Sequence, residues 1–427
     1  KQIRIYKIMA MYIYKLIGFI LIPFIPFIIF RRLSDGKETK GRTNERYGKT
    51  QIKNISNKLV WIHAASVGES LSIIPIVKEM IKDKYFDTIL ITTGTTSSSK
   101  IIKQKLGNKV IHQFIPFDIV IYAKRFLNHW KPSLAIFVES EIWPNIIYET
   151  KKMNIPLIIL NGRMTLKTFK RWTLLGSFSK KLFSNFDACC TQNSDSTIFY
   201  KKLGIINTEF TGNLKFAHHD IKIDEESYDY LKNSSRDRVI FLAASTHNGE
   251  ENIIKNISLN ISKVHKNLLT IIVPRHPQRK DILAGVKGNK IAVRSKKEKI
   301  TKNTLFYIAD TIGELNLFYK LANVIFVGGS MVNHGGQNPI EAAYYGKTIL
   351  HGKNIQNFTD VYEILKLMKL TEQVENERQL ELFVNRLIDN YKNTNTHQTK
   401  KISTALKKEG NEAVNNSMNV INRVIGY

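Results

Sequence analysis

The chain has 427 residues, 43% of them hydrophobic, and a formal net charge of +28 at pH 7. It is too long for one typical domain, so we expect two domains of about 200 residues, each with enough apolar side chains for a packed core. Residues 1–213 carry 33 basic and 14 acidic side chains, a balance of +19, whereas residues 214–427 carry 31 and 22, a balance of +9. This positive excess suits an anionic membrane surface or a phosphorylated acceptor. Nucleic acid is the rival partner, but no helix-turn-helix, zinc-finger or RNA-recognition signature is present, so we expect no nucleic acid to bind.

The composition also excludes several classes of protein. Two adjacent cysteines, Cys189 and Cys190, form no disulfide framework, which favours a reducing compartment. The histidines lack the spacing of metal ligands, and neither a Gly-x-Gly-x-x-Gly turn nor a Gly-x-x-x-x-Gly-Lys-Ser/Thr phosphate loop occurs. We therefore expect no metal and no cofactor, which argues against dinucleotide-dependent oxidoreductases and ATPases.

An apolar stretch near the N-terminus predicts a membrane anchor. Residues 9–30 are mostly apolar, residues 16–30 carry no charge, and Arg31 and Arg32 follow directly. The run is at the short end of the roughly 17–25 residues that span a bilayer. No small-residue cleavage site follows, so residues 1–35 are expected to form an anchor, spanning or partly inserted, rather than a cleaved signal peptide. The basic cluster that follows favours a catalytic body on the cytoplasmic side.

Beyond the anchor, apolar strand-like runs alternate with turns and helical patterns. One series covers residues 36–213, and a second covers residues 214–427 and ends in a closing helix that is expected to return to the first domain. Repeated strand–turn–helix units predict an α/β fold of parallel sheets with helices on both faces, with a boundary near residues 212–236. Ligands of such sheets bind at the carboxyl ends of the strands, where all the turns discussed next are expected.

One acidic turn in the first series predicts a catalytic residue. Glu69 follows the strand-like run 60–64 and the turn that contains Ser66 and Gly68, where the glycine permits a close approach of substrate. The spacing leaves two interpretations equal. Glu69 is either a general base toward a hydroxyl group or a cap of the following helix.

A second pair of acids, Glu139 and Glu141, lies where the apolar run 134–138 leaves its sheet. Two acids one residue apart repel each other, so we expect one pKa of the pair to rise, which is commoner at functional sites than elsewhere. The alternative is a solvated pair before a helix that begins at Pro144. The crowding favours a functional pair.

The most informative stretch of the second series is the glycine-rich segment 328–342, which follows the apolar run 324–327. Such a strand-to-helix turn leaves backbone N–H groups unpaired and aimed outward, so we predict that it binds the phosphate of a nucleotide. Glu341, in the first helical turns, is placed to accept hydrogen bonds from ribose hydroxyls. The alternative is an ordinary tight loop that Asn338 caps, with Pro339 at the first helical position.

A second turn with binding chemistry follows the apolar run 269–273. It contains Arg275 and His276, and Arg275 is suited to bidentate bonds with phosphate or carboxylate. The flanking prolines stiffen this turn. Taken alone, it would be interpreted as a basic loop in a basic protein.

These blocks together resemble one family. From the anchor to about residue 365, the chain is similar to the bacterial 3-deoxy-D-manno-octulosonic acid (Kdo) transferases of lipopolysaccharide synthesis. The blocks that carry the resemblance are residues 44–48, 63–69, 139–145, 161–163, 211–215, 274–277 and 328–341.

The resemblance implies a GT-B fold, in which two Rossmann-like domains face a cleft, with the acceptor bound by the first domain and CMP-Kdo by the second. It implies transfer of Kdo from CMP-Kdo to the lipid A precursor lipid IVA, with inversion and without a metal, at the inner membrane. Glu69 then corresponds to the general base, and Glu139 and Glu141 to a second acidic motif. The residues that would bind substrate or nucleotide are Ser66, Gly68, Lys215, Arg275, His276, Gly328, Gly329, Ser330, Gly336, Asn338 and Glu341.

Two other functions stay open at this point. One is a GT-B glycosyltransferase that uses a UDP-sugar and a lipid-linked acceptor, against which the block 63–69 and the paired acidic motif argue. The other is a non-catalytic basic protein bound to a membrane or to nucleic acid. Its binding would depend strongly on salt and would survive replacement of Glu69.

Overall fold

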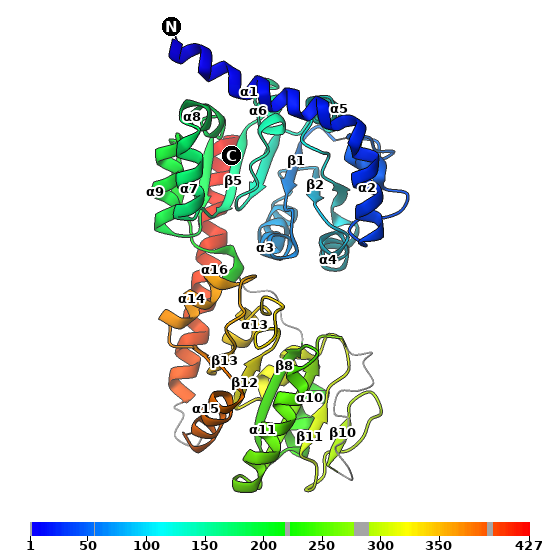
Figure 1. The fold of residues 1–427 in the computed structure, drawn as a ribbon, viewed down its shortest axis with the longest axis vertical. Coiled ribbons are helices and arrows are strands. Elements are labelled where there is room, and N and C mark those ends of the chain that lie inside the picture. Colours follow the sequence, from blue (N-terminus) through cyan, green and yellow to red (C-terminus); the bar gives the residue numbers. More distant parts are fainter. Residues whose placement is uncertain (1, 55, 218–222, 277–289, 391–395) are drawn as a thin grey trace. The chain divides into compact units, whose positions relative to one another are not determined.

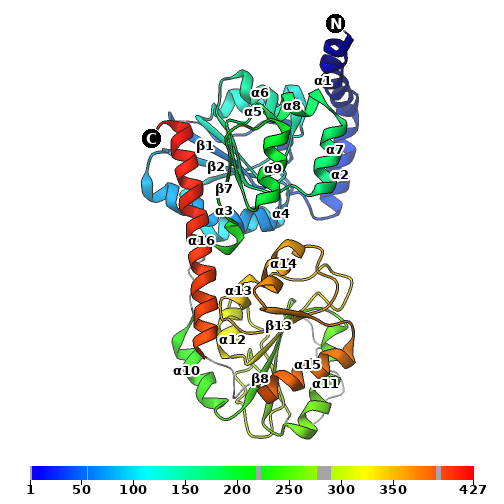
Figure 2. The same ribbon diagram turned by 90° about the vertical axis from the view of Figure 1, so that its left-hand side faces the viewer.

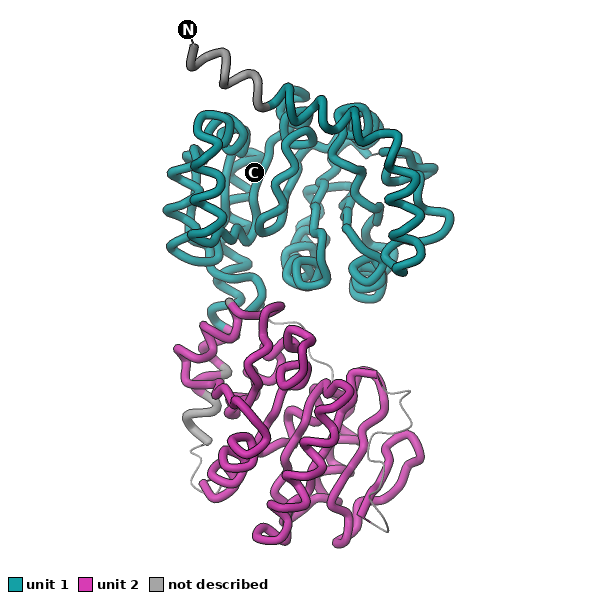
Figure 3. Tube along the Cα trace, viewed as in Figure 1, with its two compact units in different colours: residues 1–219, 408–427 teal, residues 220–407 magenta. Residues whose placement is uncertain are grey.

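The computed structural model describes residues 2–54, 56–217, 223–276, 290–390 and 396–427. The chain divides into two compact units, residues 1–219 with 408–427 and residues 220–407 (Figure 3). Each unit contains a parallel sheet of seven strands with helices packed on its faces (Figures 1 and 2). The α/β fold expected from the alternation of strand-like and helical segments is confirmed.

The sheet of the first unit has the strand order β3-β2-β1-β4-β5-β6-β7. Its interior strands are mostly apolar because both of their faces are covered, and β4 is buried at all five positions. Neighbouring β1 and β4 are parallel, with Ile62 opposite Ile136, so the turns that follow these two strands lie at one edge of the sheet. The strands are β1 (Leu59–His63), β2 (Thr88–Thr93), β3 (Ile111–Phe114), β4 (Leu134–Val138), β5 (Leu157–Gly162), β6 (Ala188–Thr191) and β7 (Thr208–Phe210).

Two apolar cores flank this sheet. One is shared with α3, α4 and the C-terminal α16, and the other with α5, α6, α8 and α9. The helices of this unit after the N-terminal segment are α3 (Val67–Asp83), α4 (Thr96–Leu106), α5 (Val120–Trp130), α6 (Pro144–Lys152), α7 (Leu166–Leu174), α8 (Ser177–Phe183) and α9 (Ser194–Leu203). Short 3-10 turns are η2 (Thr43–Tyr47), η3 (Gly107–Lys109) and η4 (Leu214–Phe216).

The N-terminal segment is helical and lies along the first unit (Figure 1). It comprises α1 (Gln2–Leu21), the turn η1 (Ile22–Phe24) and α2 (Ile25–Ser34). Prolines near the starts of η1 and α2 interrupt the helix, since proline lacks the N–H that a helix interior needs. Residues Met11–Ser34 are long and apolar enough to cross a membrane, judged by length and composition.

The second unit repeats the architecture with the strand order β10-β11-β9-β8-β12-β13-β14. Its strands are β8 (Val239–Thr246), β9 (Leu268–Pro274), β10 (Ile291–Val293), β11 (Phe306–Ile308), β12 (Val324–Val327), β13 (Ile349–His351) and β14 (Thr371–Gln373). Its helices are α10 (Glu225–Ser234), α11 (Glu250–Val264), α12 (Leu315–Leu321), α13 (Ile340–Ala343), α14 (Thr359–Leu367) and α15 (Glu377–Asn390).

The last helix, α16 (Thr396–Ile425), explains why the expected second domain, 214–427, differs from the compact unit 220–407. Residues 408–427 pack in the first unit, where Val420 and Ile421 enter its core. Gly410 permits the approach, because a Cβ at that position would overlap the carbonyl oxygen of Phe216. The C-terminal part of the helix is therefore a structural element of the first unit.

Candidate active site

Glu69 lies in the first turn of α3, directly after β1. Its carboxylate folds back over the helix start and accepts hydrogen bonds from the Ala65 N–H at 2.8 Å and the Ser66 hydroxyl at 2.7 Å. Ser66 is the N-cap residue, and its Oγ accepts from the Glu69 N–H at 3.3 Å. The Glu69 residue is 9% exposed. Ser66 therefore caps the helix, and Glu69 supports that cap, as one interpretation of the sequence required in kind; these contacts fix the Glu69 carboxylate in one place.

The environment of Glu69 raises its pKa to about 7. Burial contributes most to this rise, followed by the negative charge of Glu141 and, more weakly, that of Glu139. The hydrogen bond from Ser66 acts in the opposite direction. A general base works best when its pKa lies near the operating pH, because it then takes and releases a proton readily. The same side chain is thus able to support the helix cap and to accept a proton from a hydroxyl group.

Glu139 has a strained backbone at the end of β4. Its φ angle of +56° is rare for a residue with a side chain. The Leu160 carbonyl accepts a hydrogen bond from its N–H at 2.9 Å, and the Tyr200 hydroxyl donates to its carbonyl at 3.1 Å. The Glu139 carboxylate forms an ion pair with Lys215 at 2.9 Å. Strain of this kind persists where the surrounding structure enforces it, and it is concentrated at functional sites.

Lys215 is held in place by two asparagines from separate sequence blocks. The side chain of Asn213 caps η4 and accepts from the Lys215 N–H at 3.0 Å. Asn161, at the end of β5, accepts from the Leu214 N–H at 3.0 Å and also has a positive φ of 54°. The blocks 161–163 and 211–215 therefore meet beside Glu139.

Glu141 contacts a histidine that the sequence analysis did not single out as a site residue. His63 is the last residue of β1 and is fully buried. Its Nε2 lies 3.4 Å from a Glu141 carboxylate oxygen, and its Nδ1 lies 3.1 Å from the Thr92 carbonyl oxygen. The indole N–H of Trp143 donates to the same Glu141 oxygen at 2.8 Å.

These contacts overturn one expectation about the acidic pair. Burial acts to raise the pKa of Glu141, but hydrogen bonds from His63 and Trp143 outweigh it and hold that pKa below its usual range. The carboxylate of Glu139 pairs with Lys215 and not with His63 or Trp143. The raised pKa belongs to Glu69, so neighbouring carboxylates have pKa values shifted in opposite directions, an arrangement typical of acid–base sites.

Gly68 leaves open space next to Glu69. A Cβ at this position would come no closer to the described residues than 3.9 Å, the distance to the Ser66 Oγ. The packing around α3 therefore does not require glycine here. A substrate could occupy the space.

The glycine-rich segment of the second unit contradicts the prediction of free N–H groups. The N–H groups of Gly329, Ser330 and Met331 all donate to the carboxylate of Glu250, at 2.7, 3.0 and 2.9 Å. The N–H of Gly328 donates to the Ala244 carbonyl at 2.8 Å. An internal carboxylate at the start of α11 thus occupies the place that we predicted for a ligand phosphate.

Tight packing also makes this turn a scaffold. A Cβ on Gly328 would lie 2.7 Å from the Ser245 carbonyl oxygen. Ser330 is fully buried. Its hydroxyl donates to the Val327 carbonyl at 2.6 Å and accepts from the Gly352 N–H at 2.9 Å. Gly336 has a φ of +79°, and its N–H donates to the Gly329 carbonyl at 2.8 Å. Glycines are needed here for close packing and for turn geometry.

The helix expected after this turn is short, since α13 has four residues. Pro339 stands at its N-cap, and Asn338 accepts from the Ile340 N–H at 3.1 Å, so the capping interpretation is correct in kind but displaced by one residue. Glu341 accepts from the amide of Asn316 at 3.3 Å.

A histidine cluster lies where β8, β9 and β12 end. The rings of His247 and His334 have centroids 3.7 Å apart, and those of His247 and His276 are 5.9 Å apart. Gln337 Nε2 lies 2.9 Å from His247 Nε2. Arg275 and His276 are exposed at the end of β9, so the turns at 275–276 and 328–338 meet around His247. Pro277 of this motif lies outside the described residues.

No metal-binding group of three or more His, Cys, Asp and Glu side chains is found in the described parts of the chain. The histidine cluster instead includes His276, which adjoins the exposed Arg275 in the chain, so imidazole and guanidinium groups follow the same strand end. Such groups suit an anionic ligand.

Comparison with known proteins identifies the family. Residues 41–218 match the model of a family described as 3-deoxy-D-manno-octulosonic-acid transferase (kdotransferase). The 3-deoxy-D-manno-octulosonic acid transferase of Rickettsia bellii is 35% identical over 383 residues, which cover 89% of this chain and 91% of that protein. The protein of the same name from Haemophilus influenzae is 34% identical over 315 residues, which cover 72% of this chain and 73% of that protein.

A solved structure supports the fold. The UDP-GlcNAc 2-epimerase of Neisseria meningitidis matches 87% of this chain and 100% of its own with a TM-score of 0.56 and 13% identity, which bears on the fold alone. The GT-B class of two Rossmann-like units is thereby confirmed. Its relatives are similar over most of its length, and the acidic blocks of the first unit meet at one sheet edge. The chain therefore belongs to the Kdo transferase family.

Proposed function

We propose that this Kdo transferase takes its sugar from CMP-Kdo and gives it to lipid IVA, the lipid A precursor, with inversion at the anomeric carbon. The observation that carries the proposal is the Glu69 carboxyl. It is fixed at the carboxyl edge of the first sheet, and its pKa is raised to about 7 by burial and by Glu141.

In this mechanism, Glu69 removes the proton from the acceptor hydroxyl as that oxygen attacks the anomeric carbon of Kdo. The bond between this carbon and the phosphate oxygen breaks, and its electron pair leaves with CMP. Attack from the face opposite the leaving group inverts the configuration. Because the leaving group is an anion that is already stable, cationic and N–H donors suffice to stabilise the charge that develops on it.

Lys215 is assigned to binding an anionic group of the substrates beside the base. Its ammonium group lies 2.9 Å from the carboxylate of Glu139, a residue with a positive φ angle. Glu139 thus acts as a positioning residue for Lys215, while His63 and Trp143 keep Glu141 ionised near Glu69.

The donor is assigned to the second unit, with Arg275, His276 and the neighbouring histidines around its phosphate or carboxylate. Asn338 and Glu341 are assigned to the nucleotide, with Glu341 toward the ribose. The N–H groups of Gly329 and Ser330 donate to Glu250 and are therefore not assigned to the ligand. Gly329, Ser330 and Gly336 are assigned to the shape of the site.

We further place the enzyme at the inner membrane, held by the N-terminal segment, with both units in the cytoplasm. The acceptor has phosphates and acyl chains. An apolar N-terminal segment and the excess of 33 basic over 14 acidic residues in the first half fit such an acceptor and an anionic lipid surface.

The direct test is a transfer assay with CMP-Kdo and a tetra-acylated lipid A precursor, in which mass spectrometry reads the products. A product heavier by one or more Kdo units is expected from the wild type and none from Glu69→Gln. CMP should raise the Tm of both proteins, whereas UDP should not. Stabilisation by UDP but not by CMP would contradict the proposed donor and favour a UDP-sugar.

A further inference from the structure

The N-terminal segment is apolar on two opposite faces. The inner face consists of Gly18, Ile22, Ile25 and Ile29. These residues recur at every third or fourth position, as residues on one face of a helix do. Ile25 and Ile29 are buried against Ile119 and Tyr122 of the first unit. The outer face consists of large apolar side chains that are 44–69% exposed, namely Tyr12, Ile13, Leu16, Ile17, Phe19, Ile20, Leu21, Phe24, Phe27 and Phe30.

The second half of α1 is fixed to the first unit by a specific polar contact. The Tyr14 hydroxyl donates to the Asp118 carboxylate at 2.8 Å. The same carboxylate accepts the N–H groups of Asn145 and Ile146 at the start of α6, at 3.1 and 2.8 Å. Gly18 also faces this region, since a Cβ there would be in ordinary van der Waals contact with the side chains of Ile119 and Asn145, at 3.8 and 3.9 Å.

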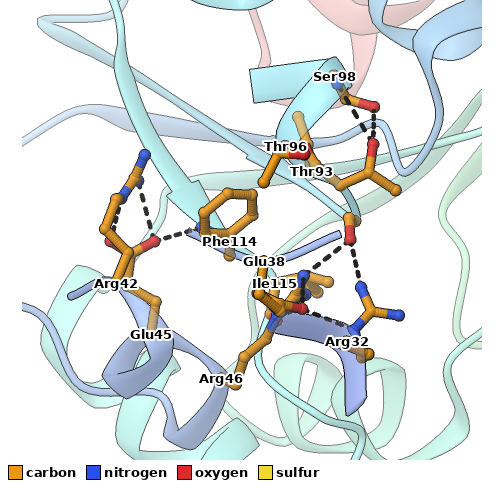
Figure 4. A network of polar contacts seen from close by, with 12 residues as sticks. Arg32, Glu38, Arg42, Glu45, Arg46, Thr93, Thr96, Ser98, Phe114 and Ile115 are labelled. Atoms are coloured by element: carbon orange, nitrogen blue, oxygen red, sulfur yellow. Dashed lines mark hydrogen bonds and ion pairs between the residues drawn. The ribbon is translucent and has the colours of Figure 1, made fainter. Parts of the chain in front are cut away.

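The C-terminal end is fixed by a buried ion cluster, which Figure 4 shows from close by. Arg32, in the last turn of α2, binds the Glu38 carboxylate at 2.7 Å and donates to the Gly94 carbonyl at 2.8 Å. Arg46 binds the same two groups, at 2.8 and 2.7 Å, and the Glu38 side chain is completely buried. Detaching Arg32 would leave the completely buried Glu38 carboxylate with one of its two cationic partners, so opening the connection weakens the compensation of a buried charge.

From these contacts we infer that α1 and α2 lie in the plane of the membrane surface and do not cross it. Tyr14 and Arg32 are separated by 18 positions, or about 27 Å of helix, which is close to the roughly 30 Å thickness of the hydrocarbon layer. A spanning helix would place these two residues on opposite sides of the bilayer. It could not keep both contacts with one folded unit that stays on one side.

The occupant of the outer face is an anionic lipid bilayer. Its apolar side chains suit the boundary between headgroups and acyl chains, while the inner face is satisfied by protein. A pocket of about 260 Å³ beside α1 is lined by Lys15 and Lys181 together with Tyr12 and Tyr148. Lysine and tyrosine at the rim of an apolar face are typical of the headgroup region.

Topology can be tested with single cysteines in the full chain, because the two native cysteines are buried. Gln2→Cys places a thiol at the start of α1, and Lys202→Cys places one on an exposed position of α9 as the cytoplasmic control. With a membrane-impermeant maleimide, we expect neither thiol to react in intact spheroplasts and both to react after lysis. Labelling of Gln2→Cys from outside, with Lys202→Cys protected, would overturn the inference. Since no turnover is measured, failure here is distinct from failure of the proposed reaction.

The outer face can be tested by flotation with vesicles of phosphatidylethanolamine and phosphatidylglycerol. Phe27→Glu places a charge at a position that is 68% exposed on the outer face, and Ile206→Glu makes the same change at a position of the first unit that is 89% exposed. We expect vesicle-bound protein to fall at least tenfold for Phe27→Glu and to be unchanged for Ile206→Glu, with both variants folded by circular dichroism. Binding of Phe27→Glu equal to wild type would contradict lipid contact by this face.

Discussion

Two carboxylates occupy similar places in the two units and have opposite roles. Glu69 follows β1, the first strand of one unit in chain order, and Glu250 follows β8, the first strand of the other. Glu69 accepts one backbone N–H and one hydroxyl, whereas Glu250 accepts four backbone N–H groups, including that of His247 at 2.9 Å.

This difference separates a reactive carboxyl from a structural one. Burial raises the pKa of both, but the hydrogen bonds from four backbone N–H groups oppose that rise at Glu250. Glu69 has fewer donors and lies near the negative charges of Glu141 and Glu139, so its pKa reaches about 7. In otherwise similar strand–turn–helix units, the number of donors and the neighbouring charges distinguish a proton acceptor from a scaffold.

The largest expected effect comes from Glu69→Gln, which keeps the shape and the cap but cannot take a proton. We expect kcat for Kdo transfer to fall by about 10²–10⁴, the usual contribution of general base catalysis. Tm and CMP binding should stay near the wild-type values. Glu79→Gln, an exposed change on the same helix, is the control and should keep full activity. A nearly normal rate for Glu69→Gln would contradict the role of Glu69 as the general base.

Glu250→Ala should act on stability and not directly on chemistry. It leaves the N–H groups of Gly329, Ser330 and Met331 without their acceptor, at about 1–3 kcal/mol each where no water replaces it. We expect the free energy of unfolding of the second unit to fall by about 3 kcal/mol or more, as measured by chemical denaturation.

Glu225→Ala is the matched control for that change. Glu225 is an exposed acid in the first turn of α10 that pairs with Lys320. Its loss should change stability by no more than about 1 kcal/mol, as for other surface ion pairs. Unchanged stability of Glu250→Ala would contradict the structural role of Glu250, and stabilisation of the wild-type protein by phosphate through this loop would show that the loop is an anion site after all.

A smaller effect is expected from Glu141→Gln, which removes a negative charge next to Glu69. That charge favours the protonated form of Glu69, so its removal lowers the pKa of Glu69. The acidic limb of the pH–rate profile, near pH 7 in the wild type, should therefore move to lower pH. A limb that stays in place, as it should in Glu79→Gln, would argue that another group titrates.

The smallest effect on stability is expected from Gly68→Ala. The change should be neutral or mildly stabilising, by up to about 1 kcal/mol, because alanine is favoured over glycine within a helix. If the acceptor occupies the space beside Glu69, the added methyl group should cost about 1–3 kcal/mol of transition-state binding, read as a lower kcat/KM. Unchanged kcat/KM would place the acceptor elsewhere.

The sequence was sufficient to predict much of the first site. Wholly apolar runs such as 134–138 predict buried parallel strands, and acids that follow such runs must lie at one sheet edge. The capping and catalytic interpretations of Glu69 could not be separated by spacing, and the structure has one side chain suited to both. His63 was missed because a histidine at the end of an apolar run gives no local sign of its partner, Glu141.

The glycine-rich loop marks the limit of local reasoning. Its sequence is typical of an anion site, but the acceptor of its N–H groups is Glu250, 79 positions before Gly329. No pattern within the loop reveals a partner that distant. The return of the closing helix to the first domain was expected and is confirmed for residues 408–427, but the close contact that accompanies it, between Gly410 and the carbonyl of Phe216, has no local sign in the sequence.

The most direct measurement is kcat/KM for Kdo transfer from pH 5 to pH 9, in wild type and Glu69→Gln side by side. We predict that the wild-type kcat/KM decreases as the pH falls below about 7, since the protonated carboxyl cannot act as a base. The much slower Glu69→Gln should show no such decrease. An identical limb in both proteins, or equal rates, would contradict the assignment of Glu69 as the general base.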